Sequence, residues 1–337
     1  MTLMKKLLKN KPFGGNAAVY LVVTVAFVVM QALASLGMLG SAMKGFLVPI
    51  CAYIVLAVSL NLLVGICGEL SLGHAGFMCV GAYLGGKISA LLVPVLGNGP
   101  VALVVSLLVG SAAAAVCGII IGLPALRLRG DYLAIVTLAF GEIVKSLFMN
   151  SSDASFGGSL RLQTPRYDKN TLFIFAFVLV LVTLFVVLNL VNSKEGRAIK
   201  AIRDNRIAAE SVGIHVMSFK LKAFVLSAFL AGMAGALFGL NYASVMASKF
   251  NFNTSIDILV FVVLGGMGNI LGSVISTVVL YILPEAMREL EDYRMIMYAV
   301  VLIVVMLCTW SPKVKGFIAV AIDTAKRKLF RKGSDTQ

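Results

Sequence analysis

Residues 170–192 read NTLFIFAFVLVLVTLFVVLNLVN, an apolar run without a single charged side chain. At a rise of about 1.5 Å per residue, a helix of this length crosses the hydrocarbon core of a bilayer, which needs about 20 apolar residues. Similar apolar runs lie at 17–40, 44–66, 70–96, 100–123, 131–149, 223–246, 256–283 and 295–310. The sequence therefore predicts an all-α polytopic membrane protein with about 9–10 membrane-embedded helices.

The composition of the whole chain agrees with this prediction. Of its 337 residues, 60% are apolar and only 13% are charged, and the mean hydropathy is +0.98. Soluble domains hold about 45–50% apolar and about 25% charged residues, so a water-soluble fold and a disordered chain are both excluded. The five cysteines lie inside apolar stretches without CxxC or metal-ligand spacing. We expect them to be reduced and structural, with no metal bound.

The charge distribution predicts the orientation. Lys and Arg outnumber Asp and Glu by 29 to 15, a net charge of +14, and they concentrate in segments 1–16, 193–222 and 311–337. Because cytoplasmic loops carry an excess of Lys and Arg, we expect all three segments, both termini included, to be cytoplasmic. The transmembrane domain would occupy 17–310. The same bias explains the positive charge without a nucleic-acid partner; the expected surroundings are membrane lipid.

The N-terminus also has features of a secretory signal. Its basic residues precede an apolar run and an Ala32-Leu33-Ala34 sequence that imitates a cleavage site. The run continues to Gly40, which is longer than a usual signal core. This length favours a first span that is retained.

The number of membrane crossings predicts that one of the later apolar runs is divided. Three runs lie between the loop 193–222 and the tail, and three crossings would place the tail outside. The candidate is 256–283, because a glycine cluster does not support a helix interior. The cluster consists of Gly265, Gly266, Met267, Gly268 and Asn269. A second Gly-rich break lies at Gly65–Gly76. Irregular backbone at membrane depth is tolerated where it lines a cavity, as in transport pathways.

Glycine spacing elsewhere predicts helix packing. Gly81–Lys87 fits G-x-x-x-x-G-K, but the next residue is Ile88, so the hydroxyl that would hold Mg²⁺ in a phosphate-binding loop is missing. Small residues four apart recur at Gly81/Gly85 and between Ala228 and Gly239. Such spacing lets helix backbones approach closely in lipid. We expect a tight core around 223–240 and no nucleotide bound by this chain.

Charged residues at membrane depth are candidates for function because they are costly there. Glu142 can pair with Lys145 three residues on, and Glu69 and His74 flank the first break. Each is compatible with a structural pair or with a role in a pathway. No catalytic motif is present, so we expect a protein that is not an enzyme.

The loop 193–222 has the composition of a helix. Gly196–Gly213 holds many helix formers and no Pro or internal Gly, and its apolar residues include Ile199, Ile202, Ala208 and Ala209. It is either a solvated connector or a short surface helix that docks into a groove on a soluble partner.

Four ordered blocks together resemble a known family. They are Gly65–Gly81 (GICGELSLGHAGFMCVG), Leu128–Glu142 (LRGDYLAIVTLAFGE), Gly196–Gly213 (GRAIKAIRDNRIAAESVG) and Leu264–Gly272 (LGGMGNILG). The chain resembles, over about 45–310, permease subunits of ABC importers for branched-chain amino acids, of the LivM type. The resemblance implies a sister permease, two cytoplasmic ABC ATPase subunits that bind ATP and Mg²⁺, and an extracytoplasmic substrate-binding protein. It also implies the bacterial cytoplasmic (inner) membrane.

The resemblance also assigns candidate sites. The ATPase-coupling residues would be Gly196, Arg197, Arg203, Ala208, Ala209, Glu210 and Gly213. The translocation path, with Glu142 added from the charge argument, would hold Glu69, Ser71, Gly73, His74, Gly76, Phe77, Glu142, Gly265, Gly266, Gly268 and Asn269.

One loop departs from the family pattern. Around residues 153–162 relatives usually show a Gly-rich run that leads into a Pro; here Gly157-Gly158-Ser159 is followed by LRLQT before Pro165. Because this loop is expected to face outside, the departure leaves substrate and docking partner open. The alternatives are a related urea or amide importer and, from another class, an ion-coupled secondary carrier that uses Glu69 or Glu142.

Overall fold

A computed structural model of the chain describes residues 20, 23–28, 30–31, 41–128, 130–152, 156–158, 161–286, 299–300 and 303. Two compact units are distinguished, residues 1–278 and 279–337. The first segment 1–16, most of the run 17–40 and of the run 295–310, and the basic tail 311–337 lie outside the described residues. The expected domain boundaries at 16 and 310 therefore stay predictions.

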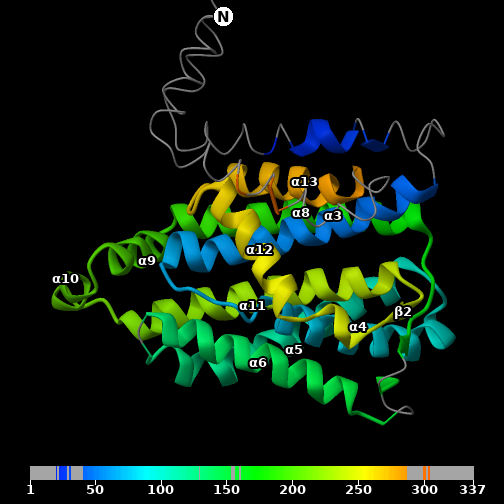
Figure 1. Cartoon of the computed structure of the whole chain (residues 1–337), viewed down its shortest axis with the longest axis horizontal. Coiled ribbons are helices and arrows are strands. Elements are labelled where there is room, and N and C mark those ends of the chain that lie inside the picture. The colour runs from blue at the N-terminus through cyan, green and yellow to red at the C-terminus, as the bar shows by residue number, and fades with distance from the viewer. Residues whose placement is uncertain are drawn as a thin grey trace, which may run out of the picture. The chain divides into compact units, whose positions relative to one another are not determined.

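The described chain is almost entirely helical (Figure 1). Its long helices are α3 (Ser41–Asn61), α4 (His74–Leu96), α5 (Pro100–Ala125), α6 (Asp131–Met149), α8 (Lys169–Asn192), α11 (Val216–Asn241), α12 (Phe252–Gly265) and α13 (Ile270–Ala286). The shorter elements are the π-helix η1 (Leu62–Cys67), α9 (Lys194–Asp204), α10 (Arg206–Ser211), the 3-10 helix η2 (Ala247–Lys249), β1 (Leu162–Gln163) and β2 (Ser244–Val245). Among the described residues, seven helical segments are long and apolar enough to cross a membrane. The predicted all-α polytopic architecture is confirmed.

Close backbone packing of α11 against α4 and α5 forms the core. A Cβ on Gly81 would lie 2.0 Å from the Gly232 carbonyl oxygen, and a Cβ on Gly235 would lie 2.0 Å from that of Met78. Only glycine permits such approaches, so small residues determine how the helices fit together. The predicted tight core around 223–240 is confirmed, and the Gly81–Lys87 sequence lies inside α4 as a packing surface.

Different elements mark the two ends of the first unit (Figure 1). At one end β1 pairs antiparallel with β2, and this pairing joins the segment before α8 to the segment after α11. At the other end α9 and α10 connect α8 to α11. The segment 193–222 and the loop that contains Gly157 and Gly158 thus lie at opposite ends of α8, as the span assignment requires.

Both Gly-rich breaks interrupt helices. In the run 256–283, α12 ends at Gly265 and α13 begins at Ile270, with Gly266 and Gly268 at φ +91° and +84°. Ser276 Oγ donates to the Phe261 carbonyl at 2.5 Å, so the two helices turn back on each other. The predicted division of this run is confirmed. In the first break, η1 ends at Cys67, residues 68–73 are not helical, and α4 begins at His74.

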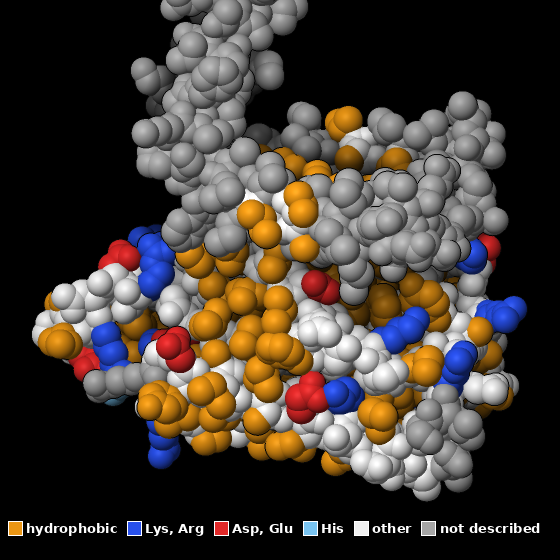
Figure 2. All heavy atoms as spheres, in the orientation of Figure 1, with side chains coloured by type: hydrophobic (Ala, Val, Ile, Leu, Met, Phe, Trp, Pro, Cys, Tyr) orange, Lys and Arg blue, Asp and Glu red, His pale blue; other side chains and the backbone are white. Residues whose placement is uncertain are grey.

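The surface agrees with a membrane setting. Figure 2 shows hydrophobic side chains spread over the middle of the bundle, while most charged side chains lie toward its two ends, one of which is formed by α9 and α10. Large apolar side chains such as Val116, Ile120 and Phe185 are more than half exposed on α5 and α8. Lipid contact is the ordinary explanation for such residues.

Candidate functional site

The two Gly-rich breaks meet in space, although about 200 residues separate them along the chain. A Cβ on Gly65 would lie 2.1 Å from the Gly268 amide nitrogen, so the two backbones touch with no room for a methyl group. Gly65 is buried within η1, and Gly268 belongs to the turn between α12 and α13. The predicted path segments Gly65–Gly76 and Gly265–Asn269 thus form one joint structure.

Asn61, the last residue of α3, holds this contact together. Its Oδ1 accepts a hydrogen bond from the Gly268 amide at 2.7 Å. Its Nδ2 donates to the Asn269 carbonyl at 3.1 Å and to Ser273 Oγ at 2.8 Å. Asn61 is fully buried, and every polar atom of its side chain is therefore used.

Sequence analysis did not single out Asn61, although a signal was present. It is an amide inside the apolar run 44–66, and polar groups at membrane depth need a partner because lipid offers none. The partners themselves could not be predicted, because nothing in the sequence specifies that α3 approaches the 266–269 turn.

Arg203 joins α9 to the same structure. Its Nη1 donates to the Gly65 carbonyl at 2.7 Å, and its Nε and Nη2 donate to Asp204 at 3.3 and 3.1 Å. The last carbonyls of a helix lack partners within the helix, and a cation near them is favourable. The aliphatic part of Arg203 covers Gly68, where a Cβ would lie 2.6 Å from Arg203 Cγ. The predicted coupling residue Arg203 therefore contacts the first break directly.

The segment predicted as one surface helix is two helices. The chain is extended at Asn205, with φ −154° and ψ 103°, and Asn205 Oδ1 accepts from the Ala208 amide at 3.1 Å. An Asn side chain that caps the backbone in this way competes with helix continuation, which explains the division. Gly213 ends the segment with φ +84°, a conformation that favours glycine. Gly196 packs against the end of α8, where a Cβ would lie 2.2 Å from the Leu190 carbonyl oxygen.

The two short helices bury one face and expose the other. Ile199, Ile202 and Ala209 are buried, and the last two pack with Val216. On the outer side Ile207 and Val212 are 80% and 75% exposed, and Ala208 is exposed as well.

A groove of about 380 Å³ lies beside this outer face. It is lined by Arg206, Glu210, Gly213, Ile214, His215, Val216 and Met217. Glu210 pairs with Arg206 at 3.0 Å, an exposed pair four residues apart on α10. Arg197 is also exposed, and its Nη1 donates to the Asn192 carbonyl at 3.3 Å. The outer face and groove provide an apolar and charged surface for a partner.

Of the charged path candidates, Glu69 lies beside the first break. It forms an ion pair with Lys220 of α11, and both side chains are 13% exposed. The pair ties the non-helical residues after η1 to the beginning of α11.

His74 is fully buried one turn further into the bundle. Its Nε2 lies 2.9 Å from Ser227 Oγ, and Ser227 gives its proton to the Ser59 carbonyl at 2.7 Å. The Nε2 of His74 must then carry the hydrogen and donate it. Through these two hydrogen bonds the His74 side chain joins α4, α11 and α3.

Glu142 of α6 lies beside Leu72 and Ala75 of the first break, away from the contact between Gly65 and Gly268. It forms an ion pair with Lys145, as predicted, and its Oε1 accepts from the Phe252 amide at 3.1 Å. It therefore caps the beginning of α12. Such partners suit a structural carboxylate better than an open ion site.

The remaining path candidates are packing residues of α4 and the turn before it. Phe77 packs against Phe140 in a tilted arrangement and against Phe224 edge to face, at centroid distances of 4.9 and 5.7 Å. Gly76 approaches α6, where its Cβ would lie 2.7 Å from Gly141 Cα. A Cβ on Gly73 would lie 2.7 Å from the Thr137 carbonyl oxygen. The hydroxyl of buried Ser71 accepts a hydrogen bond from the Gly73 amide at 3.4 Å. The structure thus joins Gly65, Gly268 and Arg203 in one contact, in which Phe77 and Glu142 take no part.

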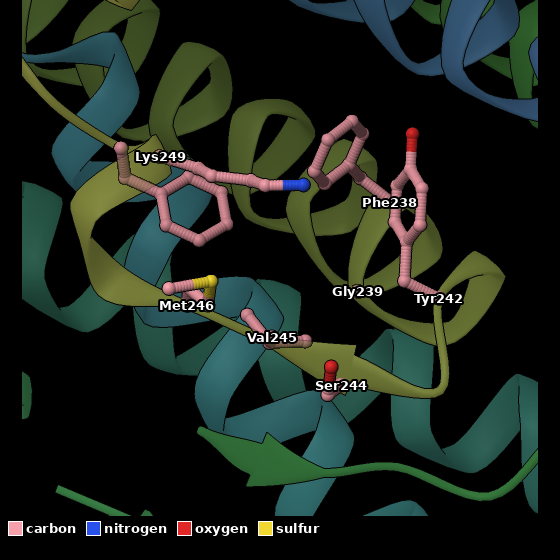
Figure 3. A pocket seen from close by; sticks show the side chains of 8 residues that line it. Phe238, Gly239, Tyr242, Ser244, Val245, Met246 and Lys249 are labelled. Atoms are coloured by element: carbon pink, nitrogen blue, oxygen red, sulfur yellow. The ribbon is translucent and has the colours of Figure 1, made fainter. Parts of the chain in front are cut away.

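A small pocket opens at the opposite end of the unit, around β2 (Figure 3). The Lys249 side chain extends across it toward Phe238 and Tyr242, with its ammonium 4.8 Å from the centre of the Tyr242 ring. The cavity measures about 10 Å³, room for about one water molecule. It is too small to enclose an amino acid within this chain alone.

No group of three or more His, Cys, Asp or Glu side chains that could hold a metal ion occurs within the part of the chain that the structure describes. Cys51, Cys67, Cys79 and Cys117 carry free thiols, and the first three are buried. Cys308 lies outside the described residues.

Comparison with known proteins gives consistent similarities. Residues 42–308 match the family described as "Branched-chain amino acid transport system / permease component". The chain is 35% identical over 297 residues to the high-affinity branched-chain amino acid transport system permease protein LivM of Escherichia coli, covering 77% of this chain and 67% of that protein. Identity to a probable LivM of Methanocaldococcus jannaschii is 26% over 280 residues, covering 72% and 80%. A probable LivH of the same organism is 29% identical over 157 residues, 46% of each chain. No solved structure matches significantly.

Proposed function

The chain belongs to the family of permease components of branched-chain amino acid transport systems, and from this membership we propose that it is a membrane subunit of an ATP-driven importer for leucine, isoleucine and valine. It is a multi-pass membrane protein and a transport permease. ATP and Mg²⁺ are bound in partner subunits, and this chain supplies the path and the mechanical coupling. The complex lies in a bacterial cytoplasmic membrane with both termini of this chain in the cytoplasm.

The observation that carries the proposal is the exposed outer face of α9 and α10. Ile207 and Val212 are 80% and 75% exposed at the end of the bundle, beside exposed charges and not among lipid-facing spans. Such a surface suits docking into a groove on a soluble protein. We assign it to the two cytoplasmic ATPase subunits, with Ala208, Glu210 and Gly213 at the contact. Ala209 and Gly196 position these helices from beneath.

A sister permease completes the path. The chain is similar both to LivM proteins and, over 157 residues, to a LivH protein, so two related permeases fit side by side. Gly268 and Asn269 of the second break are exposed on this chain and provide a wall that the sister subunit covers. An extracytoplasmic substrate-binding protein delivers the amino acid at the end that carries β1 and β2.

The ion-coupled carrier is the less favoured alternative. A coupling ion needs carboxylate oxygens that are free to bind it. Glu69 pairs with Lys220, and Glu142 pairs with Lys145 and accepts from the Phe252 amide. Both carboxylates therefore already have partners, which supports the ATP-driven mechanism. A urea or amide importer differs only in the ligand that the binding protein holds, so substrate competition separates it.

Uptake into proteoliposomes tests the proposal. The complex is purified through a tag on this chain and reconstituted with the binding protein. We expect uptake of radiolabelled leucine that requires ATP, is inhibited by excess isoleucine and valine, and survives ionophores. If urea or acetamide inhibits uptake and isoleucine and valine do not, the proposed substrate class is wrong. Uptake by this chain alone, driven by an ion gradient and abolished by ionophores, would overturn the ATP-driven mechanism.

Two variants of Gly213 test the coupling surface. Gly213→Val places a β-branched side chain at φ +84°, where it is strained, whereas Asn tolerates this conformation. We expect Gly213→Val to lose leucine uptake while the spanning bundle still assembles, and Gly213→Asn to retain most of it. Equal uptake by the two variants would remove Gly213 from the coupling surface.

A further inference from the structure

Three contacts run without interruption from α9 to both breaks. Arg203 of α9 donates to the Gly65 carbonyl at 2.7 Å, and its aliphatic part lies against Gly68. Gly65 in turn touches Gly268 across a distance that leaves no room for a Cβ. Asn61 fastens the far side with hydrogen bonds of 2.7–3.1 Å to Gly268, Asn269 and Ser273.

We propose that Arg203, Gly65 and Asn61 form a strut through which α9 moves the 62–68 segment and the 266–273 turn as one unit. Arg203 and Asn61 are positioning residues in it: they act on the path through the backbone that they hold. The inference rests on the proposed function and deepens it, because it names the residues that carry motion from the ATPase contact to the path.

Two physical features make this joint stiff. Asn61 is fully buried with all its polar atoms bonded, so separating it from the turn would leave several groups without partners. Close contacts between the Gly65 and Gly268 backbones transmit displacement directly, because packed interiors have low compressibility.

Within the described part of the chain, one hydrogen bond, from Arg203 to the Gly65 carbonyl, connects α9 to the breaks, which makes it the place to test. Arg203→Ala removes the guanidinium, whereas Arg203→Lys keeps a charged donor on a side chain of similar length. Lys200→Ala is the matched control, because Lys200 is on the same helix and has no hydrogen bond or ion pair among the described residues. We expect Arg203→Ala to keep the ATPase subunits and ATP hydrolysis but to lower leucine uptake per ATP about tenfold. Arg203→Lys should recover most of that loss.

Asn61→Leu tests the other end of the strut. Leu has a similar volume but makes no hydrogen bonds to the 266–273 turn. Because both variants break the same chain of contacts, Arg203→Ala with Asn61→Leu should lower uptake per ATP no further than the worse single variant. Losses that multiply, or an Arg203→Ala variant that behaves like Lys200→Ala, would overturn the proposal.

A disulfide between positions 68 and 203 separates a role in transmitting motion from a merely structural role. A Cβ on Gly68 would lie 3.5 Å from Arg203 Cβ, a separation that a disulfide can bridge. In a chain whose five native cysteines are replaced, Gly68→Cys with Arg203→Cys lacks the guanidinium when reduced and carries a disulfide in its place when oxidised. A strut predicts low uptake per ATP in the reduced protein and recovered uptake after oxidation.

The controls separate the possible failures. Gly68→Cys alone measures the strain of a side chain at φ +76° together with its overlap with Arg203 Cγ, 2.6 Å from the added Cβ. If that variant is active and oxidation of the pair brings no recovery, the strut is refuted. If Arg203→Ala does not assemble, the cysteine pair is purified oxidised and then reduced, so that assembly precedes loss of the link. Wild-type complex without ATP-driven uptake would instead refute the proposed function, and this is seen before any variant is made.

Discussion

At the scale of single residues, the contact between the two breaks depends on Gly65, which has no side chain. Gly65 does not need glycine for its backbone dihedral angles, since its φ is not positive. It needs glycine because Asn61 Oδ1 and the Gly268 amide occupy the space of a Cβ, at 2.0 and 2.1 Å. The amide nitrogen belongs to backbone and cannot rotate away, so a methyl group must push the two breaks apart.

Gly65→Ala is therefore expected to destabilise the joint between the breaks. Overpacking of this kind costs about 1–3 kcal/mol, and we expect the thermal unfolding midpoint of the purified complex to fall by several degrees together with leucine uptake. Thermal unfolding in detergent and uptake in proteoliposomes measure the two effects. The matched control is Gly45→Ala in α3, where no atom of a described residue lies within 4 Å of the added Cβ. Equal unfolding midpoints for the two variants would contradict the packing argument.

At the scale of elements, the turn after η1 is tied to α11 by Glu69 and Lys220. A second ion pair, Lys222 with Glu195, connects α11 to α9 at 2.6 Å. The first pair is 13% exposed on both sides, whereas the second is 60% and 45% exposed. Exposed pairs contribute about 0–1 kcal/mol, but an unpaired charge in a shielded site is costly. Removal of one partner should therefore destabilise the protein more at the Glu69–Lys220 pair than at the Glu195–Lys222 pair.

Glu69→Gln should destabilise the complex by about 1–3 kcal/mol, because it leaves Lys220 without a counter-charge. Glu195→Gln is the matched control and should change stability by less than about 1 kcal/mol. If Glu69 is structural, Glu69→Gln combined with Lys220→Met should restore both the unfolding midpoint and uptake. Restored stability without uptake would mean that the carboxylate itself acts in transport, as an ion-coupled carrier requires.

The same elements show which features could be predicted from the sequence and which could not. Glycine clusters predicted both breaks, because glycine within an apolar run opposes helix continuation whatever surrounds it. The contact of Gly65 with Gly268 depends on how α3 approaches the α12–α13 turn, which local pattern does not encode. Asn205 divided the predicted surface helix because its side chain caps α10, an outcome that helix propensity alone leaves open.

At the scale of the whole molecule, α8 defines the two sides of the membrane. Its 24 residues span about 36 Å, enough to cross a bilayer core of about 30 Å. One end follows the β1 segment and the other leads directly into α9. The basic segment 193–222 carries the charge bias of a cytoplasmic loop. The orientation of α8 therefore determines which end can meet the proposed ATPases and which the proposed binding protein.

Cysteine labelling at the two ends of α8 tests this orientation. Asn170 and Lys194 are both exposed, one in the first turn of α8 and the other just beyond its last residue. In a chain without its native cysteines, Asn170→Cys should react with a membrane-impermeant maleimide in intact cells, and Lys194→Cys only in inverted vesicles. The reverse pattern would place α9 and α10 outside, where no ATP-hydrolysing partner can reach them. Because α8 has no charged side chain between these positions, reaction of both from one side would mean that it does not cross the membrane at all.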